Sequence, residues 1–223
     1  QKILSLLHDK KIKRVILAGG VSRPGPMALL SIYSFFRNRD ELKRIVSGGD
    51  DRILRGVIRL LEENNFSVIG VNEAAPKLLA IEGLLGSINE PPTSIADIDM
   101  ALSCLRMISP YDIGQGVVVA QGRVLAIEGP EGTDAMLDRV RIMQKNRRVI
   151  LEENTAILVK ASKHGQDHRV DLPAIGPRTI KNAKAAGLAG IAIAAGEVII
   201  VNRNDTIKDA DRAGLFIKGV RLS

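Results

Sequence analysis

Short apolar β runs alternate with segments of helical periodicity along this chain, and that alternation restricts the fold more than any other feature. The apolar run Lys13–Leu17 leads into a Gly-rich loop and then into a helix predicted over Met27–Phe36. A helix predicted over Arg52–Glu63 is followed by the next apolar run, Phe66–Val71. Two strands separated by a helix are typical of a parallel sheet. The first part of the chain therefore predicts an α/β domain with a Rossmann-like parallel sheet.

The second part of the chain has the same mixture of elements and adds a hairpin. A helix is predicted over Ile95–Ile108. The apolar runs Gly116–Ala120 and Val124–Glu128 follow, and so short a turn between two such runs is typical of a β-hairpin. The rest alternates between strands and helices, which predicts a mixed-sheet α/β domain. Its predicted helices are Thr133–Lys145, Arg178–Ala186 and Thr206–Ala213, and its predicted strands are Ala156–Lys160, Gly190–Ala194, Glu197–Val201 and Leu215–Val220.

A polar stretch with two prolines interrupts this pattern between Gly86 and Ser94. Such a composition is typical of a linker. We therefore predict a first domain over residues 1–86, a linker over residues 87–94 and a second domain over residues 95–223. Loops of a ligand-binding type occur on both sides of this boundary, so we expect the two domains to flank one cleft.

The composition excludes several classes of protein. Aromatic residues make up only 3% of the chain and Trp is absent, so few side chains could stack on the bases of single-stranded nucleic acid. The single cysteine, Cys104, excludes an internal disulfide and a zinc site built on cysteines, and its helical neighbours indicate a small core residue. No apolar run approaches the roughly 20 residues of a membrane span, and we see no signal peptide.

The net charge is positive and unevenly distributed. Residues 1–86 contain 14 basic and 9 acidic side chains, and residues 87–223 contain 18 and 16. A basic face suits a phosphate ligand, anionic lipid headgroups or nucleic acid. Because the basic residues are scattered rather than gathered in a tract, we disfavour nucleic acid as a partner.

Two loops of the first domain are candidates for anion or metal binding. The loop after the first apolar run contains Gly19, Gly20, Arg23 and Pro24. Small residues at a strand end let backbone N–H groups approach a phosphate, and an arginine could bind its oxygens. The alternative is a tight turn with a surface arginine, since the loop matches neither the Walker nor the GxGxxG pattern. The second loop ends in Asp50-Asp51, which could cap a helix or bind Mg²⁺.

Two loops of the second domain carry the acidic side chains. Glu128, Glu131 and Asp134 lie within seven residues at a strand-to-helix junction, which indicates either helix capping or a ligand or metal site. The loop over residues 160–173 mixes both charges and two histidines. An extended backbone there would place Asp167, Arg169 and Asp171 on one face, which suits metal binding or activation of water. Zinc bound by two histidines and an aspartate, or a solvated surface loop, remain alternatives.

Clustered carboxylates beside phosphate-binding loops are typical of phosphoryl or phosphodiester chemistry with a divalent cation. The rival interpretation is a non-catalytic protein that binds a nucleotide or a nucleotide-sugar through the same Gly-rich loop. The residues themselves do not identify the substrate.

The same loops resemble those of a known family. The motifs RVILAGGVSRP, GDD followed by ILRGV, ADIDMAL, YDIGQGVVVAQGRVLAIEGPEGTDAML, and VDLPAIGPRTI with AGLAGIAIAAGEVIIV are similar to the UDP-2,3-diacylglucosamine pyrophosphatases of lipid A biosynthesis in alphaproteobacteria. The resemblance covers nearly the whole chain. It implies Mg²⁺-dependent hydrolysis of UDP-2,3-diacylglucosamine to UMP and 2,3-diacylglucosamine 1-phosphate (lipid X). It also implies a strand, a loop and a helix before Gln1, so we expect the first domain to be incomplete at its start.

The resemblance also implies roles for single residues. The aspartate of the DLPxIG motif, Asp171, is expected to be essential, with Asp167 as a second catalytic carboxylate. Asp171, Glu131 and Asp134 are the expected metal ligands. We further expect a peripheral enzyme on the cytoplasmic side of the inner membrane, with a homodimer left open. The expected substrate contacts are Gly19, Gly20, Arg23, Pro24, Gln115, Thr133, Lys160, Gln166, Arg169, Leu172 and Ile175.

Overall fold

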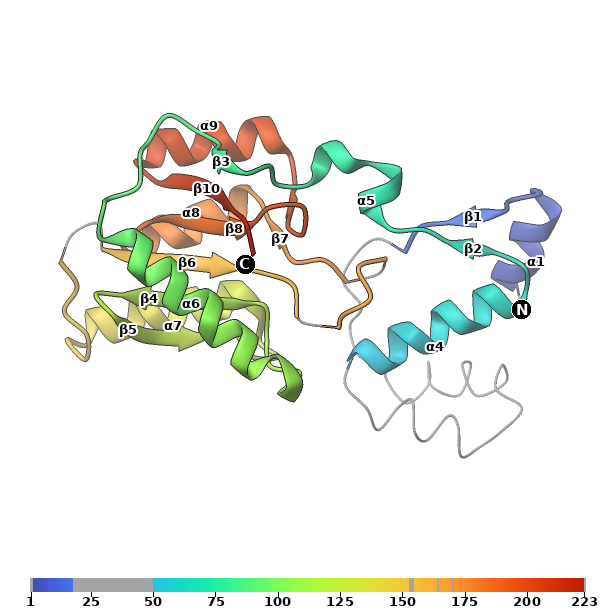
Figure 1. The fold of residues 1–223 in the computed structure, drawn as a ribbon, viewed down its shortest axis with the longest axis horizontal. Coiled ribbons are helices and arrows are strands. Elements are labelled where there is room, and N and C mark those ends of the chain that lie inside the picture. The colour runs from blue at the N-terminus through green and yellow to red at the C-terminus, as the bar shows by residue number, and fades with distance from the viewer. Residues whose placement is uncertain (1, 18–49, 153–154, 164, 170, 223) are drawn as a thin grey trace. The chain divides into compact units, whose positions relative to one another are not determined.

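The computed structural model describes residues 2–17, 50–152, 155–163, 165–169 and 171–222 (Figure 1). The chain divides into two compact units. Unit 1 consists of Gln1–Ala74 together with Gln166–Asp171, and unit 2 consists of Ala75–Gly165 together with Leu172–Ser223. The short segment Gln166–Asp171 therefore belongs to unit 1, although its neighbours on both sides in the sequence belong to unit 2.

Unit 1 contains a parallel pair of strands, as predicted. Arg14 of β1 lies opposite Ser67 of β2, and the two strands run in the same direction. Buried Ile58 and Leu61 of α4 pack with Phe66 and Val68, because their spacing places them on one face of the helix. The described elements are α1 (Lys2–Asp9), β1 (Arg14–Val15), α4 (Asp50–Glu63), β2 (Ser67–Val68) and α5 (Val71–Ala74). The helix predicted over Met27–Phe36 lies outside the described residues.

Unit 2 is built on a six-stranded mixed sheet in the order β3-β10-β8-β6-β4-β5. Strands β6, β8 and β10 are parallel to one another, whereas β4 is antiparallel to β5 and β6, and β3 is antiparallel to β10. The predicted α/β class with a mixed sheet is confirmed. The strands are β3 (Gly83–Leu84), β4 (Gly116–Ala120), β5 (Arg123–Ile127), β6 (Ala156–Lys160), β7 (Ala174–Ile175), β8 (Leu188–Ala194), β9 (Ile199–Ile200) and β10 (Phe216–Val220); β7 and β9 form a separate parallel pair.

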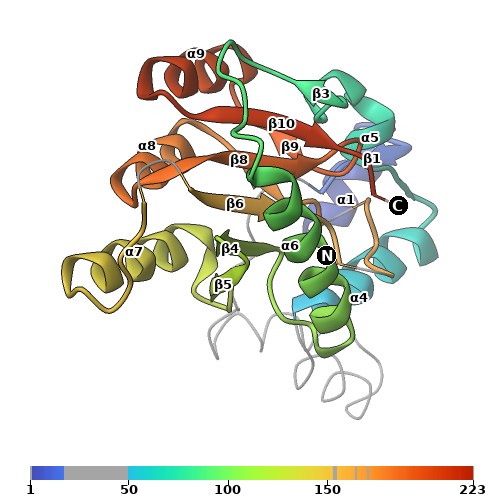
Figure 2. The same ribbon diagram turned by 60° about the vertical axis from the view of Figure 1, so that its left-hand side comes forward.

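The helices cover both faces of this sheet. Helix α6 lies on one face, and α7, α8 and α9 lie side by side along the other (Figure 2). The core between these layers is aliphatic apart from Phe216, whose ring packs where Gly190 lacks a side chain: a Cβ on Gly190 would lie 2.2 Å from the ring. The helices are α6 (Ser94–Ile108), α7 (Gly132–Lys145), α8 (Pro177–Ala185) and α9 (Arg203–Ala213), with short 3₁₀ turns at Pro76–Leu78 and Ser109–Tyr111.

The predicted hairpin is confirmed, and a buried carboxylate holds its turn. Gln121 and Gly122 both adopt positive φ (52° and 73°), as a two-residue turn of this kind requires. Their backbone N–H groups donate to the two oxygens of Asp97 on α6, at 2.8 and 2.7 Å. Asp97 thus fixes the hairpin to the helix that covers it.

The stretch predicted as a linker makes contacts inside unit 2. The backbone N–H of Ser87 donates to Asp211 at 2.7 Å, and Glu90 forms an ion pair with Lys218 of β10. The two units divide between Ala74 and Ala75, earlier in the chain than the predicted boundary. The linker over residues 87–94 and the cleft between the two predicted domains stay predictions.

No helix among the described residues is long and apolar enough to cross a membrane.

Candidate functional site

In unit 2, Lys160 is the last residue of β6, and its side chain lies beside the N-terminus of α7. Its side chain is only 4% exposed. The ammonium donates a hydrogen bond of 2.6 Å to Thr133 Oγ1, and a long one of 3.4 Å to the carbonyl of Ala174. A buried cation beside a helix N-terminus creates a positive potential that favours a phosphate group. Two predicted substrate contacts, Lys160 and Thr133, are therefore brought together.

Glu128 completes this cluster, and only one of its two carboxylate oxygens accepts a hydrogen bond from the described residues. Thr133 Oγ1 donates to Oε1 at 2.9 Å, and Lys160 Nζ lies 3.6 Å from Oε2. Oε2 is buried and accepts no hydrogen bond from the residues that the structure describes. The carboxylate fits there because Gly116 has no side chain, since a Cβ on Gly116 would lie 2.5 Å from Oε2. We call Glu128, Thr133 and Lys160 the lysine cluster.

The two other acidic residues of this loop are each engaged by an arginine. Glu131 accepts a hydrogen bond of 2.6 Å from Arg139, and its pKa is lowered, chiefly by a hydrogen bond from its own backbone N–H. Asp134 lies 2.6 Å from Arg178 and accepts a hydrogen bond of 2.8 Å from Asn182. The Asp134 contacts tie α7 to α8, whereas the contact of Glu131 with Arg139 lies within α7 and the residue that precedes it. Asp134 also lines a pocket between α7 and α8.

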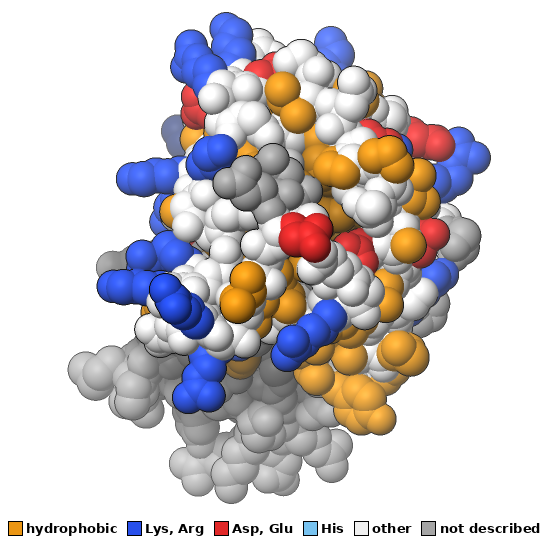
Figure 3. Space-filling model, turned by 90° about the vertical axis from the view of Figure 1, so that its left-hand side faces the viewer, with side chains coloured by type: hydrophobic (Ala, Val, Ile, Leu, Met, Phe, Trp, Pro, Cys, Tyr) orange, Lys and Arg blue, Asp and Glu red, His pale blue; other side chains and the backbone are white. Residues whose placement is uncertain are grey.

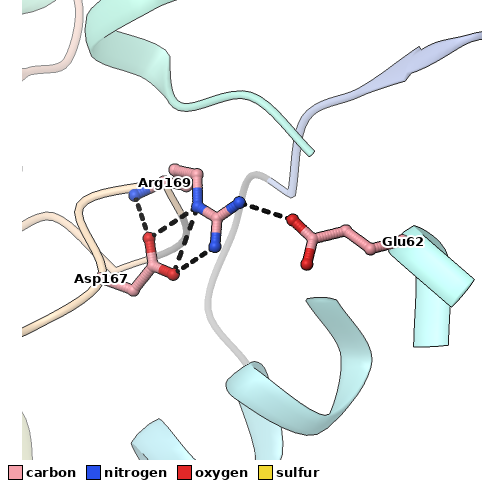
Figure 4. A network of polar contacts seen from close by, with 3 residues as sticks. All are labelled: Glu62, Asp167 and Arg169. Atoms are coloured by element: carbon pink, nitrogen blue, oxygen red, sulfur yellow. Dashed lines mark hydrogen bonds and ion pairs between the residues drawn. The ribbon is translucent and has the colours of Figure 1, made fainter. Parts of the chain in front are cut away.

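In unit 1, the segment Gln166–Asp171 carries a network centred on Arg169 (Figure 4). The guanidinium donates to Asp167 through Nε at 3.0 and 3.2 Å and through Nη2 at 2.7 Å, and Nη1 donates to Glu62 on α4 at 2.7 Å. The pKa of Asp167 is lowered, mainly by these side-chain hydrogen bonds, and the pKa of Arg169 is raised by the same contact. We call Glu62, Asp167 and Arg169 the arginine network.

The network changes the sequence-based prediction for this loop. Instead of an extended stretch, the segment forms a turn in which the backbone N–H of Asp171 donates to the carbonyl of Asp167 at 3.3 Å. The backbone N–H of Arg169 donates to the Asp167 carboxylate at 3.0 Å. Gln166 donates its side-chain amide to Oδ2 of Asp171. The carboxylates therefore occupy different places in one braced turn rather than one face of a strand.

The remaining predicted contacts have more varied positions. Leu172 and Gln115 are half-buried, and the carbonyl of Gln115 accepts a hydrogen bond from Ala161 at 3.1 Å. Ile175 is 1% exposed and belongs to the core of unit 2. Cys104 is partly buried against the same core, and burial raises the pKa of its thiol. The loop with Gly19, Gly20, Arg23 and Pro24 lies outside the described residues, as does His164.

Sequence reasoning missed two participants. Glu62 gave no signal, because its partner Arg169 is 107 residues away. Gly116 looked like an ordinary strand residue, although it makes room for Glu128. Among the described residues, no three His, Cys, Asp or Glu side chains gather as a metal site.

One face of the molecule is seen in Figure 3. Lys and Arg side chains are distributed around it, with apolar and acidic side chains between them. This agrees with the scattering of basic residues along the sequence.

Comparison with known proteins shows the family. Residues 1–78 match the model of the LpxI N-terminal domain, and residues 81–218 match the model of the LpxI C-terminal domain. A curated relative from Caulobacter vibrioides, named UDP-2,3-diacylglucosamine pyrophosphatase LpxI, is 42% identical over 219 residues, which is 98% of this chain and 78% of that protein. The resemblance seen in the sequence motifs is thereby confirmed, and the chain belongs to the LpxI family.

Proposed function

We propose that this protein hydrolyses the pyrophosphate of UDP-2,3-diacylglucosamine in lipid A synthesis and releases UMP and 2,3-diacylglucosamine 1-phosphate. The observation that carries the proposal is the 42% identity to a relative with that name over nearly the whole chain. In this reaction the oxygen of water forms a bond to one phosphorus, and the bond from that phosphorus to the bridging oxygen breaks. The other phosphate leaves with the bridging oxygen.

We assign the polar residues of each unit a role in this reaction. The lysine cluster supplies a buried cation and a hydroxyl beside the α7 N-terminus, a combination that suits non-bridging phosphate oxygens. Asp171 supplies a carboxylate held in a braced turn, which suits acceptance of a proton from the attacking water. Asp167 is less suited to that task, because Arg169 already neutralises it.

We also propose that the reaction requires Mg²⁺ and that Asp171 is one of its ligands. A bound Mg²⁺ would neutralise negative charge on the pyrophosphate. Of the other predicted ligands, Glu131 is engaged by Arg139 and Asp134 by Arg178, so these two side chains fit a supporting role at the start of α7 better than metal binding.

The lipid part of the substrate suggests where the enzyme works. Each CH₂ removed from water contributes roughly 0.8 kcal/mol, so two acyl chains would dominate affinity for the ground state. We propose peripheral contact with the cytoplasmic surface of the inner membrane, helped by the basic excess of residues 1–86.

One assay tests the function. The protein is incubated with UDP-2,3-diacylglucosamine in vesicles, with Mg²⁺ and then with excess EDTA, and UMP and the lipid phosphate are measured. We expect both products in equal amounts with Mg²⁺ and neither with EDTA. Tight binding without UMP would favour the nucleotide-sugar binding protein, and equal rates with EDTA would overturn the Mg²⁺ requirement alone.

A further inference from the structure

We propose that Arg169 and Glu62 are positioning residues. They attach the turn that contains Asp171 to the C-terminal end of α4. This inference rests on the proposed function, because it assumes that Asp171 takes part in the reaction. The turn is covalently joined to unit 2 at both ends, yet it folds as part of unit 1.

The guanidinium of Arg169 binds two carboxylates at once. Arg169 binds Asp167 two residues before it through a fork, and it reaches Glu62 with its remaining nitrogen (Figure 4). A planar guanidinium can serve two carboxylates at once, whereas an ammonium is a single point charge. The arginine therefore links the turn to α4. It does so with the same N–H donors that an arginine would use to bind a phosphate.

A steric contact, which does not depend on charge, also holds the turn. Gly70 follows β2 closely, and a Cβ placed on it would lie 3.0 Å from the Cα of Arg169 and 3.2 Å from the carbonyl oxygen of His168. The backbone of the turn thus packs directly on the backbone after β2. Two contacts of different kinds, one ionic and one steric, fix the turn to the same unit.

Asp167 connects the anchored turn to Asp171. Asp167 accepts from Arg169 with its carboxylate and from the backbone N–H of Asp171 with its carbonyl. Moving Arg169 therefore disturbs the residue that holds the Asp171 backbone. Without the guanidinium, the carboxylates of Glu62 and Asp167 would also repel each other.

The decisive experiment compares Arg169→Gln, Arg169→Lys and Glu62→Gln with wild type. We expect Arg169→Gln to lower kcat about tenfold or more with little change in KM, and Glu62→Gln to lower it less. Arg169→Lys should have a kcat close to that of Arg169→Gln, because a single ammonium does not replace the paired N–H donors of the guanidinium. The matched control is Arg221→Gln, which removes an exposed arginine that donates to Glu82 through Nε and Nη2, and it should keep wild-type kinetics.

A second readout does not depend on activity. Hydrogen exchange of the amide of Asp171 should become faster in Arg169→Gln and Glu62→Gln, while exchange in β6 and β8 stays unchanged. A raised KM with unchanged kcat would identify Arg169 as a substrate contact and overturn the inference. Wild-type kinetics and exchange in both variants would overturn it as well. If wild-type protein releases no UMP, the proposed function fails, and the exchange data still decide whether Arg169 and Glu62 hold the turn.

Discussion

The lysine cluster and the arginine network both pair a cation with carboxylates, but they do so in different surroundings. Lys160 and Glu128 are 4% and 12% exposed, whereas Arg169 and Glu62 are 39% and 47% exposed. In the buried cluster, loss of one partner leaves a charge in a medium that solvates it poorly. In the exposed network, water and salt compensate for much of the loss. We therefore expect loss of the lysine cluster to lower the free energy of unfolding. Loss of the arginine network should mainly change the geometry of the turn that contains Asp171.

The largest effect on stability should come from Lys160→Met, which removes the cation but keeps most of the length of the side chain. Glu128 would then be buried without its ion pair, which costs about 3–5 kcal/mol. Urea denaturation monitored by circular dichroism measures the change. The double variant Lys160→Met, Glu128→Gln should recover most of the loss, and equal stability of the two variants would contradict the importance of this pair.

The largest effect on turnover should come from Asp171→Asn. The substitution keeps the shape of the side chain and removes its charge, so we expect turnover to fall at least ~10²-fold, within the range for a general base. Binding of UDP-2,3-diacylglucosamine should largely survive, because the acyl chains and uridine keep their contacts. A folded variant with turnover near that of wild type would remove Asp171 from the reaction.

An intermediate effect is expected for Gly116→Ala. The new methyl group would overlap Glu128 Oε2 and push the carboxylate away from Lys160, at a cost of about 1–3 kcal/mol in unfolding free energy. The control is the same substitution in a Glu128→Ala background, where the overlap is absent. If Gly116→Ala costs the same in both backgrounds, the glycine does not serve the carboxylate.

The smallest effect concerns acid stability. Hydrogen bonds from Arg169 lower the pKa of Asp167 in the folded protein. The contribution of Asp167 to stability is therefore complete above the pKa of the unfolded state, about 3.9. It is lost as the pH falls through the lower pKa of the folded state. Thermal denaturation at a series of pH values below about 5 should show a steeper loss for wild type than for Asp167→Asn. Parallel losses in the two proteins would contradict a stabilising role for this pair.

Local patterns in the sequence predicted most of the described fold. The apolar runs that became β4, β6 and β8 are long enough to show their character, and the pair Gln121-Gly122 marks its hairpin. Strands β3 and β7 escaped prediction, because two residues show no period, whereas β9 lies inside the predicted strand Glu197–Val201. Their pairing depends on partners that are distant in sequence, as when Gly83 pairs with Gly219.

The candidate site was predictable in its composition but not in its pairings. Lys160, Thr133 and Asp171 stood out because polar residues follow apolar strands. The pairings between residues distant in sequence depended on tertiary packing: Arg169 also pairs with Glu62, and Asp134 pairs with Arg178. Short-range spacing contains no information on a partner such as Glu62.

Unit 1 is made of two separate stretches of sequence, which has a consequence for folding during synthesis on the ribosome. Gln166–Asp171 emerges only after β3, β4, β5 and β6 of the other unit, and before β8 and β10. Neither unit therefore has its full sequence until Asp171 has been synthesised. Domains of many proteins fold one after another during synthesis. Here the last part of the first unit arrives in the middle of the second, so the first unit cannot complete its folding before much of the second has been synthesised.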